Sequence, residues 1–242
     1  MIATSLRASL TDGDYRLALG LLAPDGEDRR RLEQRTETDG PDVLWDDPRL
    51  VDRLLAYRSL EAPSAALFLY AVMRRLLLET GVGDRAVADY CAALLLVFGR
   101  GDRALRISEH EDDRTAYLVD LMIVAGRAEG ERRFRVQMHI GDFALWMAGI
   151  FPDYIAARRA RKGGPGLDYY ERAGRAAFLE ASDHRLAGRY GLGDVLRQAG
   201  ERFAQLRVAL NRMSDRMLFP HHAGPDRLLR QVADEFRLRD LQ

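Results

Sequence analysis

Apolar residues recur along much of the chain at intervals of three and four, which is the spacing of one face of an α-helix. Between 129 and 150, five of them follow this spacing: Val136, Ile140, Phe143, Met147 and Ile150. The segments 63–79 and 84–98 are apolar on nearly all sides, which predicts two helices in the middle of the fold. A clean alternation of apolar and polar residues, typical of a strand, is absent from the sequence.

Glycine, proline and aspartate separate these segments in the way that helix ends require. Asp84 stands before one apolar segment as a cap, and Gly99 follows the same segment. The chain contains no repeat of fixed period. The sequence therefore predicts an all-α protein, a single domain over 1–242 with about eight to ten helices in orthogonal or bundle-like packing.

Three stretches fit this regular pattern less well. Residues 162–166, Lys-Gly-Gly-Pro-Gly, form the clearest linker and the one candidate for a subdomain boundary. Residues 24–47 are highly charged and contain Asp39-Gly40-Pro41, so we expect a mobile or loop-rich segment there. The stretch 102–113 is compatible with either a short strand or a helical turn.

The composition is that of an ordinary globular protein. The chain has 242 residues, of which 47% are hydrophobic and 31% charged, and its formal net charge is zero. A chain of this length can bury a core without disulfides or structural metals. Because the charges balance, nothing global attracts the protein to nucleic acid or to an anionic membrane.

The single cysteine and the apolar runs bear on the cellular location. Cys91 lies within an apolar stretch, so we expect a core residue rather than a nucleophile, in a reducing compartment. The first ten residues do not resemble a signal peptide. The longest apolar runs, 62–73 and 116–125, are shorter than the ~20 residues that span a bilayer. We expect a cytoplasmic protein that does not insert into membranes.

Polar residues inside the most apolar helices are the main candidates for chemistry, because P-loop, dinucleotide-binding and nucleophile-elbow motifs are missing from the sequence. Burial of an unpaired charge is costly, so each of these residues needs a partner. His139 and Asp142 are three residues apart and share one helix face. We expect a buried polar network of Asp89, Asp120, His139 and Asp142.

Two kinds of partner would satisfy this network. In the structural alternative, Asp142 orients His139 and arginines neutralise the aspartates, and no cofactor is needed. In the other, helices bring together a metal site of His139, Asp142, Glu180 and His184, a ligand set suited to non-haem iron or manganese. The Glu-x-x-His pattern of di-iron helices does not occur in the sequence.

A basic patch precedes the glycine linker. It consists of Arg158, Arg159, Arg161 and Lys162, the last being the only lysine of the chain. Beside tyrosines at 169 and 170, such a patch could make weak contacts with RNA or DNA. Basic residues at the end of a helix also offset the helix dipole without any ligand. The dilution by nearby acidic residues makes nucleic-acid binding the less favoured interpretation.

These observations favour a helical interaction or regulatory protein without catalytic activity. We expect a protein partner or self-association. The alternatives are the metal or cofactor site centred on His139 and Asp142, and weak nucleic-acid binding through 158–162.

Overall fold

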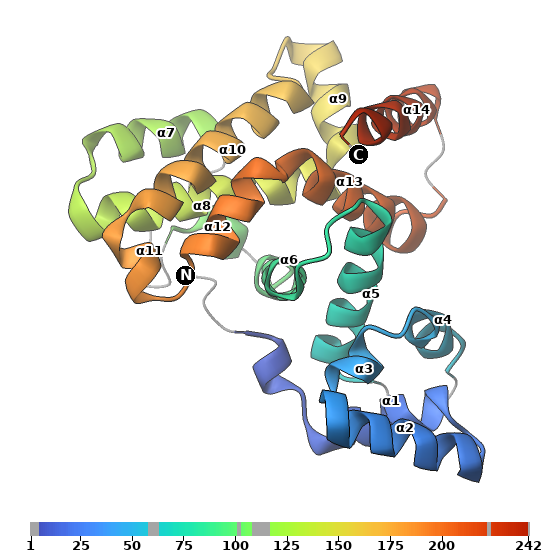
Figure 1. Cartoon of the computed structure of the whole chain (residues 1–242). Helices are drawn as coiled ribbons and strands as arrows, with labels where there is room; N and C mark the ends of the chain where they lie inside the picture. Colours follow the sequence, from blue (N-terminus) through green and yellow to red (C-terminus); the bar gives the residue numbers. More distant parts are fainter. Residues whose placement is uncertain (1–4, 58–62, 101–102, 108–116, 222–223, 242) are drawn as a thin grey trace.

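The computed structural model describes residues 5–57, 63–100, 103–107, 117–221 and 224–241. All regular structure in these residues is helical, with no strand among them (Figure 1). The prediction of an all-α protein with a single domain is confirmed. The predicted number of helices was too low, because several helices are only four to nine residues long.

Fourteen α-helices, two 3-10 helices and one π-helix follow one another along the described chain. The α-helices are α1 (Asp12–Leu22), α2 (Gly26–Asp39), α3 (Asp42–Trp45), α4 (Arg49–Ala56), α5 (Ala65–Glu79), α6 (Arg85–Phe98), α7 (Leu118–Arg127), α8 (Gly130–Ile150), α9 (Pro152–Lys162), α10 (Leu167–Asp183), α11 (Arg185–Arg189), α12 (Gly193–Glu201), α13 (Phe203–Met213) and α14 (Pro225–Asp240). The short elements are η1 (Arg7–Ser9), η2 (Arg103–Leu105) and the π-helix η3 (Ser214–Leu218).

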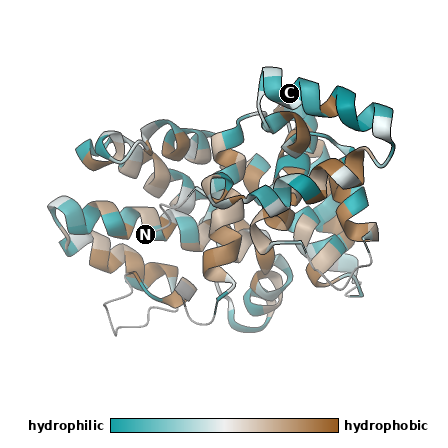
Figure 2. Ribbon diagram, turned by 90° about the horizontal axis from the view of Figure 1, so that it is seen from below, coloured by the Kyte–Doolittle hydropathy of each residue, from teal (hydrophilic) through white to brown (hydrophobic). Residues whose placement is uncertain are grey.

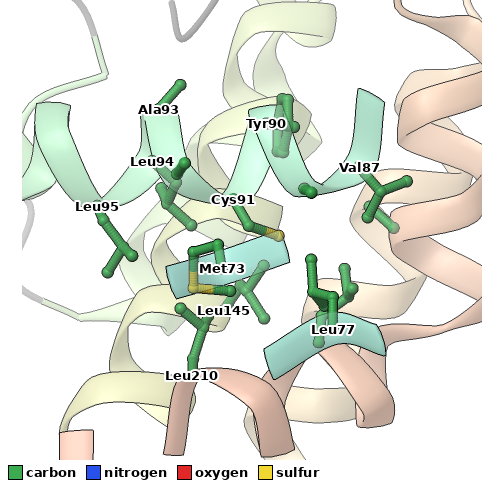
Figure 3. Packing of buried hydrophobic residues seen from close by; sticks show 14 of the residues in the cluster. Met73, Leu77, Val87, Tyr90, Cys91, Ala93, Leu94, Leu95, Leu145 and Leu210 are labelled. Carbon is green, nitrogen blue, oxygen red and sulfur yellow. The ribbon is translucent and has the colours of Figure 1, made fainter. Parts of the chain in front are cut away.

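Helix α6 runs through the centre of the molecule. Every residue from Val87 to Leu95 is buried, as the apolar pattern of 84–98 predicts. Figure 3 shows how side chains from three other helices surround it: Met73 and Leu77 of α5, Leu145 of α8 and Leu210 of α13. The core therefore joins helices that are more than a hundred residues apart in the sequence.

Helix α8 packs against α10 so closely that glycine is required at the contact. A Cβ atom on Gly141 of α8 would lie 2.6 Å from the ring of Phe178 on α10, and one on Gly174 of α10 would lie 2.9 Å from the Cβ of Ala144 on α8. Neither glycine has an unusual backbone conformation, so the absence of a side chain is what matters. The helix pair is thereby packed at close range on the core side of α10.

The segment 24–47, which we expected to be loop-rich, is mostly helical. Helix α2 buries only Leu32 and Thr36, so it lacks the apolar face that a sequence pattern reveals. Two Arg–Glu pairs four residues apart lie along it, Arg29 with Glu33 and Arg31 with Glu27, an arrangement that supports an exposed helix. Gly40, with a φ of 84°, ends the helix.

The remaining boundaries follow local backbone chemistry. The linker 162–166 is the turn between α9 and α10, where Gly163 adopts a left-handed conformation with a φ of 64°. Of the stretch 102–113, the described residues 103–107 contain the short helix η2, whereas 102 and 108–113 lie outside the described residues. In the part of the chain that the structure describes, no helix is both long and apolar enough to cross a membrane.

Candidate interaction surface of the C-terminal helix

Asp142 and His139 are both buried on α8, as predicted. The Tyr90 hydroxyl of α6 donates a hydrogen bond of 2.5 Å to Asp142 Oδ1. Burial, with the nearby charge of Asp142, raises the pKa of Tyr90 well above its usual value of 10.0. The His139 ring lies beside Phe98, with ring centroids 5.7 Å apart. Asp142 thus accepts a hydrogen bond from a hydroxyl of the neighbouring helix within the core.

Cys91 lies next to Tyr90 and is fully buried, which confirms its prediction as a core residue. Burial, followed by the charge of Asp142, raises the pKa of the thiol to about 12. A thiol of this kind stays protonated at neutral pH and is a poor nucleophile.

Asp89 is also buried, but its partners come from the N-terminal segment rather than from α8. Ser5 Oγ donates to Asp89 Oδ2 at 2.6 Å, and the backbone N–H of Arg7 donates to Oδ1 at 2.8 Å. The carboxylate therefore ties the start of the described chain to the central helix. The partners expected for the buried aspartates were arginine guanidiniums, whereas these are a hydroxyl and an amide.

Asp120 does not belong to this network, and its prediction as a buried residue was wrong. It is exposed on α7, whose buried face consists of Leu118, Leu121 and Ala125. Its apolar neighbours Val119, Met122 and Ile123 are exposed as well. Apolar flanking residues indicated burial, but in α7 they also occupy the outer face.

The four residues of the predicted metal site are not brought together. Glu180 is exposed on α10, where Arg133 Nε and Gln137 Nε2 each donate to it at 2.7 Å. His184 accepts a hydrogen bond from the Leu186 amide as the cap of α11. In the described residues, no group of three or more histidine, cysteine, aspartate or glutamate side chains is placed to hold a metal ion.

The basic patch occupies the last turns of α9. Arg158 is half-buried and stacks over the ring of Tyr117, with 4.9 Å from its guanidinium carbon to the ring centroid. Arg159, Arg161 and Lys162 are exposed in the last turn, before the cap at Gly163. This is the position at which basic side chains offset the helix dipole.

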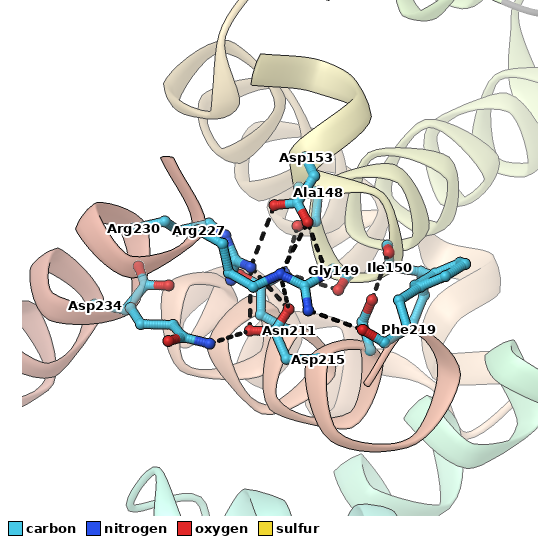
Figure 4. Close-up of polar contacts among 12 residues, drawn as sticks. Ala148, Gly149, Ile150, Asp153, Asn211, Asp215, Phe219, Arg227, Arg230 and Asp234 are labelled. Atoms are coloured by element: carbon cyan, nitrogen blue, oxygen red, sulfur yellow. Dashed lines mark hydrogen bonds and ion pairs between the residues drawn. The ribbon is translucent and has the colours of Figure 1, made fainter. Parts of the chain in front are cut away.

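A feature that the sequence analysis missed is the way in which α14 attaches to the body. Its inward face carries arginines and an aspartate (Figure 4), with Leu238 as its one large buried apolar residue among those described. Arg227 and Arg230 are each only 8% exposed in their side chains. Arg227 Nη2 donates to Asp153 of α9 at 2.7 Å, and Arg230 Nη2 donates to Asp215 of η3 at 2.8 Å. The helix is held by buried ion pairs.

Arg207 of α13 forms a second group of buried ion pairs that attach α14 to the body. It is almost completely buried and binds both Glu171 of α10 and Asp234 of α14. Burial by itself would lower the pKa of its guanidinium, but the hydrogen bonds and charges of these two carboxylates outweigh burial and raise the pKa above its ordinary value. Arg207 also donates to Asn211, whose amide donates to two carbonyls at the end of α8, those of residues 148 and 149.

Because the charged side of α14 faces the body, its outer face is apolar. Its side chains are 63% exposed at Leu228, 69% at Leu229, 54% at Val232 and 63% at Phe236. Their spacing places them on one side of the helix, opposite the ion pairs. We call these four residues the α14 stripe. In Figure 2 the hydrophobic residues gather in the central helices, whereas α14, next to the label C, is coloured mostly hydrophilic.

A surface helix normally turns its apolar side towards the core and its charged side towards water. Helix α14 does the opposite, which leaves an apolar surface with no partner among the described residues. Exposed apolar surface of this kind is typical of binding sites. No family model, curated protein or solved structure matches this chain.

Proposed function

We propose that the chain is a helical interaction or regulatory protein that acts by binding and not by catalysis, and that it self-associates through the α14 stripe. The observation that carries this proposal is the outward orientation of Leu228, Leu229, Val232 and Phe236 on a helix whose charged side is buried.

Two copies can bury this surface through a symmetric contact. A two-fold axis near Val232 would set two α14 helices antiparallel, with Phe236 of one copy against Leu228 of the other. Such an arrangement uses the same patch twice, which is the commonest way in which soluble proteins form dimers.

The size of the stripe favours a weak dimer. Complete burial of a large apolar side chain contributes about 1.5–3 kcal/mol, so eight partly exposed side chains contribute on the order of 7–15 kcal/mol. Association itself costs about 4–15 kcal/mol. Because the two ranges are similar, the dimer should form and dissociate with protein concentration.

The absence of catalysis and the cytoplasmic location are parts of the same proposal. Support comes from Cys91, which is a free thiol held protonated in the core, and from Tyr90 and Asp142, which are enclosed with it. In the proposed role, Cys91, Tyr90 and Asp142 contribute to the packing of the core.

Sedimentation velocity over a range of protein concentrations tests self-association. The weight-average mass of the wild type should rise from 27.4 kDa towards twice that value as the concentration increases. Leu229→Glu and Phe236→Glu should each keep the protein at the monomer mass, because a carboxylate in the contact would lose its hydration.

Ile123→Glu provides the matched control. Ile123 is 49% exposed on α7, at the opposite side of the molecule from α14 (Figure 1), so this variant should associate like the wild type. A wild type that stays at the monomer mass at every concentration would refute the proposal. Equal association of the wild type and both stripe variants would also contradict it.

A further inference from the structure

One face of α9 carries an exposed aromatic ring together with three cations. Tyr154, Arg158, Arg161 and Lys162 stand at positions i, i+4, i+7 and i+8, so their side chains lie on the same side of the helix. Tyr154 is 52% exposed, Arg158 is half-buried, and the last two are exposed. We call these four residues the α9 face. Aromatic and basic groups are presented together on it.

Three further tyrosines lie around Arg158. Its guanidinium carbon is 4.9 Å from the ring centroid of Tyr117, which is 50% exposed. Tyr170 is buried, and burial raises the pKa of its hydroxyl, although the charge of Arg158 offsets part of that rise. The half-buried Tyr169 packs edge-on against Tyr170, with ring centroids 6.0 Å apart. The rings therefore hold Arg158 in a fixed position.

The acidic residues that dilute this patch in the sequence are occupied by other arginines. Asp168 pairs with Arg172 at 3.1 Å. Asp153 accepts a hydrogen bond from Arg227 at 2.7 Å. Glu171 is bound in the buried ion pairs that attach α14. A count of charges along the sequence therefore underestimates the positive charge of the α9 face.

The three cations of the α9 face form no ion pair with any carboxylate among the described residues. The exposed Asp120 of α7 does not approach them. It stands two positions from Met122, the α7 residue whose sulfur lies 3.4 Å from the Tyr169 hydroxyl. Residues two apart in a helix point to different sides, so Asp120 lies on the far flank of α7. The cations are available to an anionic ligand.

The helix dipole explains only part of this surface. It favours basic residues in the last turn of α9, where Arg161 and Lys162 lie. It gives no reason for the exposed ring of Tyr154 two turns earlier, or for the stacking of Arg158 over Tyr117. Exposed rings next to cations are the combination that binds single-stranded nucleic acid, because bases stack on the rings and phosphates contact the cations.

We infer that the α9 face, with Tyr117 and Tyr169 beside it, binds single-stranded RNA or DNA. One base stacks on Tyr154 and another on the exposed part of Tyr117, while the phosphates contact Arg161 and Lys162. A duplex fits less well, because its bases are already stacked on one another. The α14 stripe takes no part in this contact, so the inference does not depend on self-association.

Fluorescence anisotropy with labelled oligonucleotides tests the inference on the full-length chain. Oligothymidylate and oligouridylate of about twelve nucleotides are long enough for a surface of this size. Both should bind at about 50 mM salt, and a duplex of the same length should bind more weakly. Because three cations contact phosphates, the slope of log K against log salt should be about −2.

Variants then locate the site. Tyr154→Leu should weaken binding by about fivefold or more, because it removes one stacking surface. The double variant Arg161→Glu, Lys162→Glu should weaken it by about tenfold or more and reduce the salt slope to about −1 or less. All three positions are exposed, so circular dichroism and the thermal midpoint should stay close to those of the wild type.

Two controls carry matched changes elsewhere on the surface. Tyr190→Leu alters a tyrosine that is 42% exposed at the end of α11. The double variant Arg16→Glu, Arg30→Glu reverses two exposed cations of α1 and α2. In Figure 1 these helices lie well away from α9, so both controls should bind the oligonucleotides like the wild type. Leu229→Glu, which addresses self-association, should also bind them like the wild type.

The inference fails if neither oligonucleotide binds, if the duplex binds as tightly as the single strands, or if Tyr154→Leu binds as well as the wild type. Equal weakening in the controls would also overturn it.

Vesicles that contain phosphatidylserine test a different occupant, because Val119, Met122 and Ile123 are exposed on the neighbouring helix α7. Vesicle binding that is lost in the charge-reversed α9 variant, without any binding of oligonucleotides, would assign the surface to an anionic membrane and overturn the inference. Because sedimentation measures the α14 stripe and anisotropy measures the α9 face, failure of either proposal is recognisable by itself.

Discussion

Helices α6 and α14 are both held to the same body by buried faces, but by opposite chemistry. Helix α6 is surrounded by apolar side chains, and its polar residues Asp89 and Tyr90 each have a hydrogen-bond partner. Helix α14 is held by Arg227, Arg230 and Asp234, whose partners are carboxylates and a guanidinium of other helices. Apolar burial fills the centre, whereas ion pairs attach a helix whose apolar side stays outside.

The two kinds of contact leave different faces of a helix available to a binding partner. A helix packed through its apolar side usually presents mainly polar groups to solvent. A helix attached through charges keeps its apolar side for a partner, although the desolvation of each buried charge offsets much of the attraction between them. Helix α14 is therefore the part of the molecule in which folding and binding use different faces.

Removal of the central cation should have the largest effect. Arg207→Leu leaves Asp234 buried without this counter-ion and leaves Glu171 with Arg237 alone. Loss of one partner from a buried pair costs about 3–5 kcal/mol. Urea unfolding should show this loss in the free energy of unfolding. Arg197→Leu, in an exposed pair with Asp183, should change it by about 1 kcal/mol or less. Equal effects of the two variants would mean that the attachment of α14 is not an ion-pair contact.

Loss of the hydrogen bond between Tyr90 and Asp142 should have the second largest effect on stability. Tyr90→Phe keeps the ring but leaves the buried Asp142 carboxylate without this donor, and a hydrogen bond to a charged group contributes about 1.5–3 kcal/mol. Thermal and urea unfolding should report the same destabilisation. Tyr190→Phe, on an exposed residue, is the control. A change below that of the control would show that Asp142 draws its stabilisation from elsewhere.

Close packing of α8 against α10 gives the third prediction. Gly141→Ala forces a methyl group against the Phe178 ring, and overpacking of a core costs about 1–3 kcal/mol. Gly20→Ala in α1 meets no atom within 4 Å and should stabilise the protein by up to about 1 kcal/mol. If both variants were stabilised, the contact between α8 and α10 would be looser than the structure indicates.

The smallest effect concerns the pairing of Asp46 with Arg74 and Arg85. Burial by itself would raise the pKa of Asp46, but hydrogen bonds from the two arginines outweigh it and hold the pKa below 3.8. The stabilisation is therefore complete above the ordinary aspartate pKa and is lost as the pH falls below it. In urea unfolding at acidic pH, Asp46→Asn should show a shallower loss of stability than the wild type. Asp183→Asn should follow the wild type, and an identical slope in Asp46→Asn would remove this pair from the acid response.

The burial of several residues could be predicted from the sequence, because each lies within a long apolar stretch. The burial of His139, Asp142 and Cys91 followed from long apolar stretches in which every helix face is covered. Asp120 lies in a similar stretch, yet it is exposed, because α7 presents apolar residues on its outer face as well. Local apolar content indicates burial only where other helices cover all sides.

The partners of these residues were not predictable, since they come from distant parts of the chain. Tyr90 is fifty-two positions from Asp142, and Ser5 is eighty-four positions from Asp89. The predicted metal set was wrong for a related reason. His139 and Asp142 share a face of α8, but His184 lies beyond the end of α10 as the cap of α11, and Glu180 pairs with Arg133 and Gln137. Helix spacing determines which residues share a face and not which faces meet.

By itself, the sequence determined the all-α class and the central place of 84–98, because hydrophobic spacing and capping residues act over a few positions. Only the tertiary structure decided that α14 turns its charged side inward. That choice depends on Asp153, Asp215, Glu171 and Arg207, which four different helices bring to one place. A helical pattern with one apolar and one charged side is compatible with either orientation, and the buried counter-ions of the body select one of them.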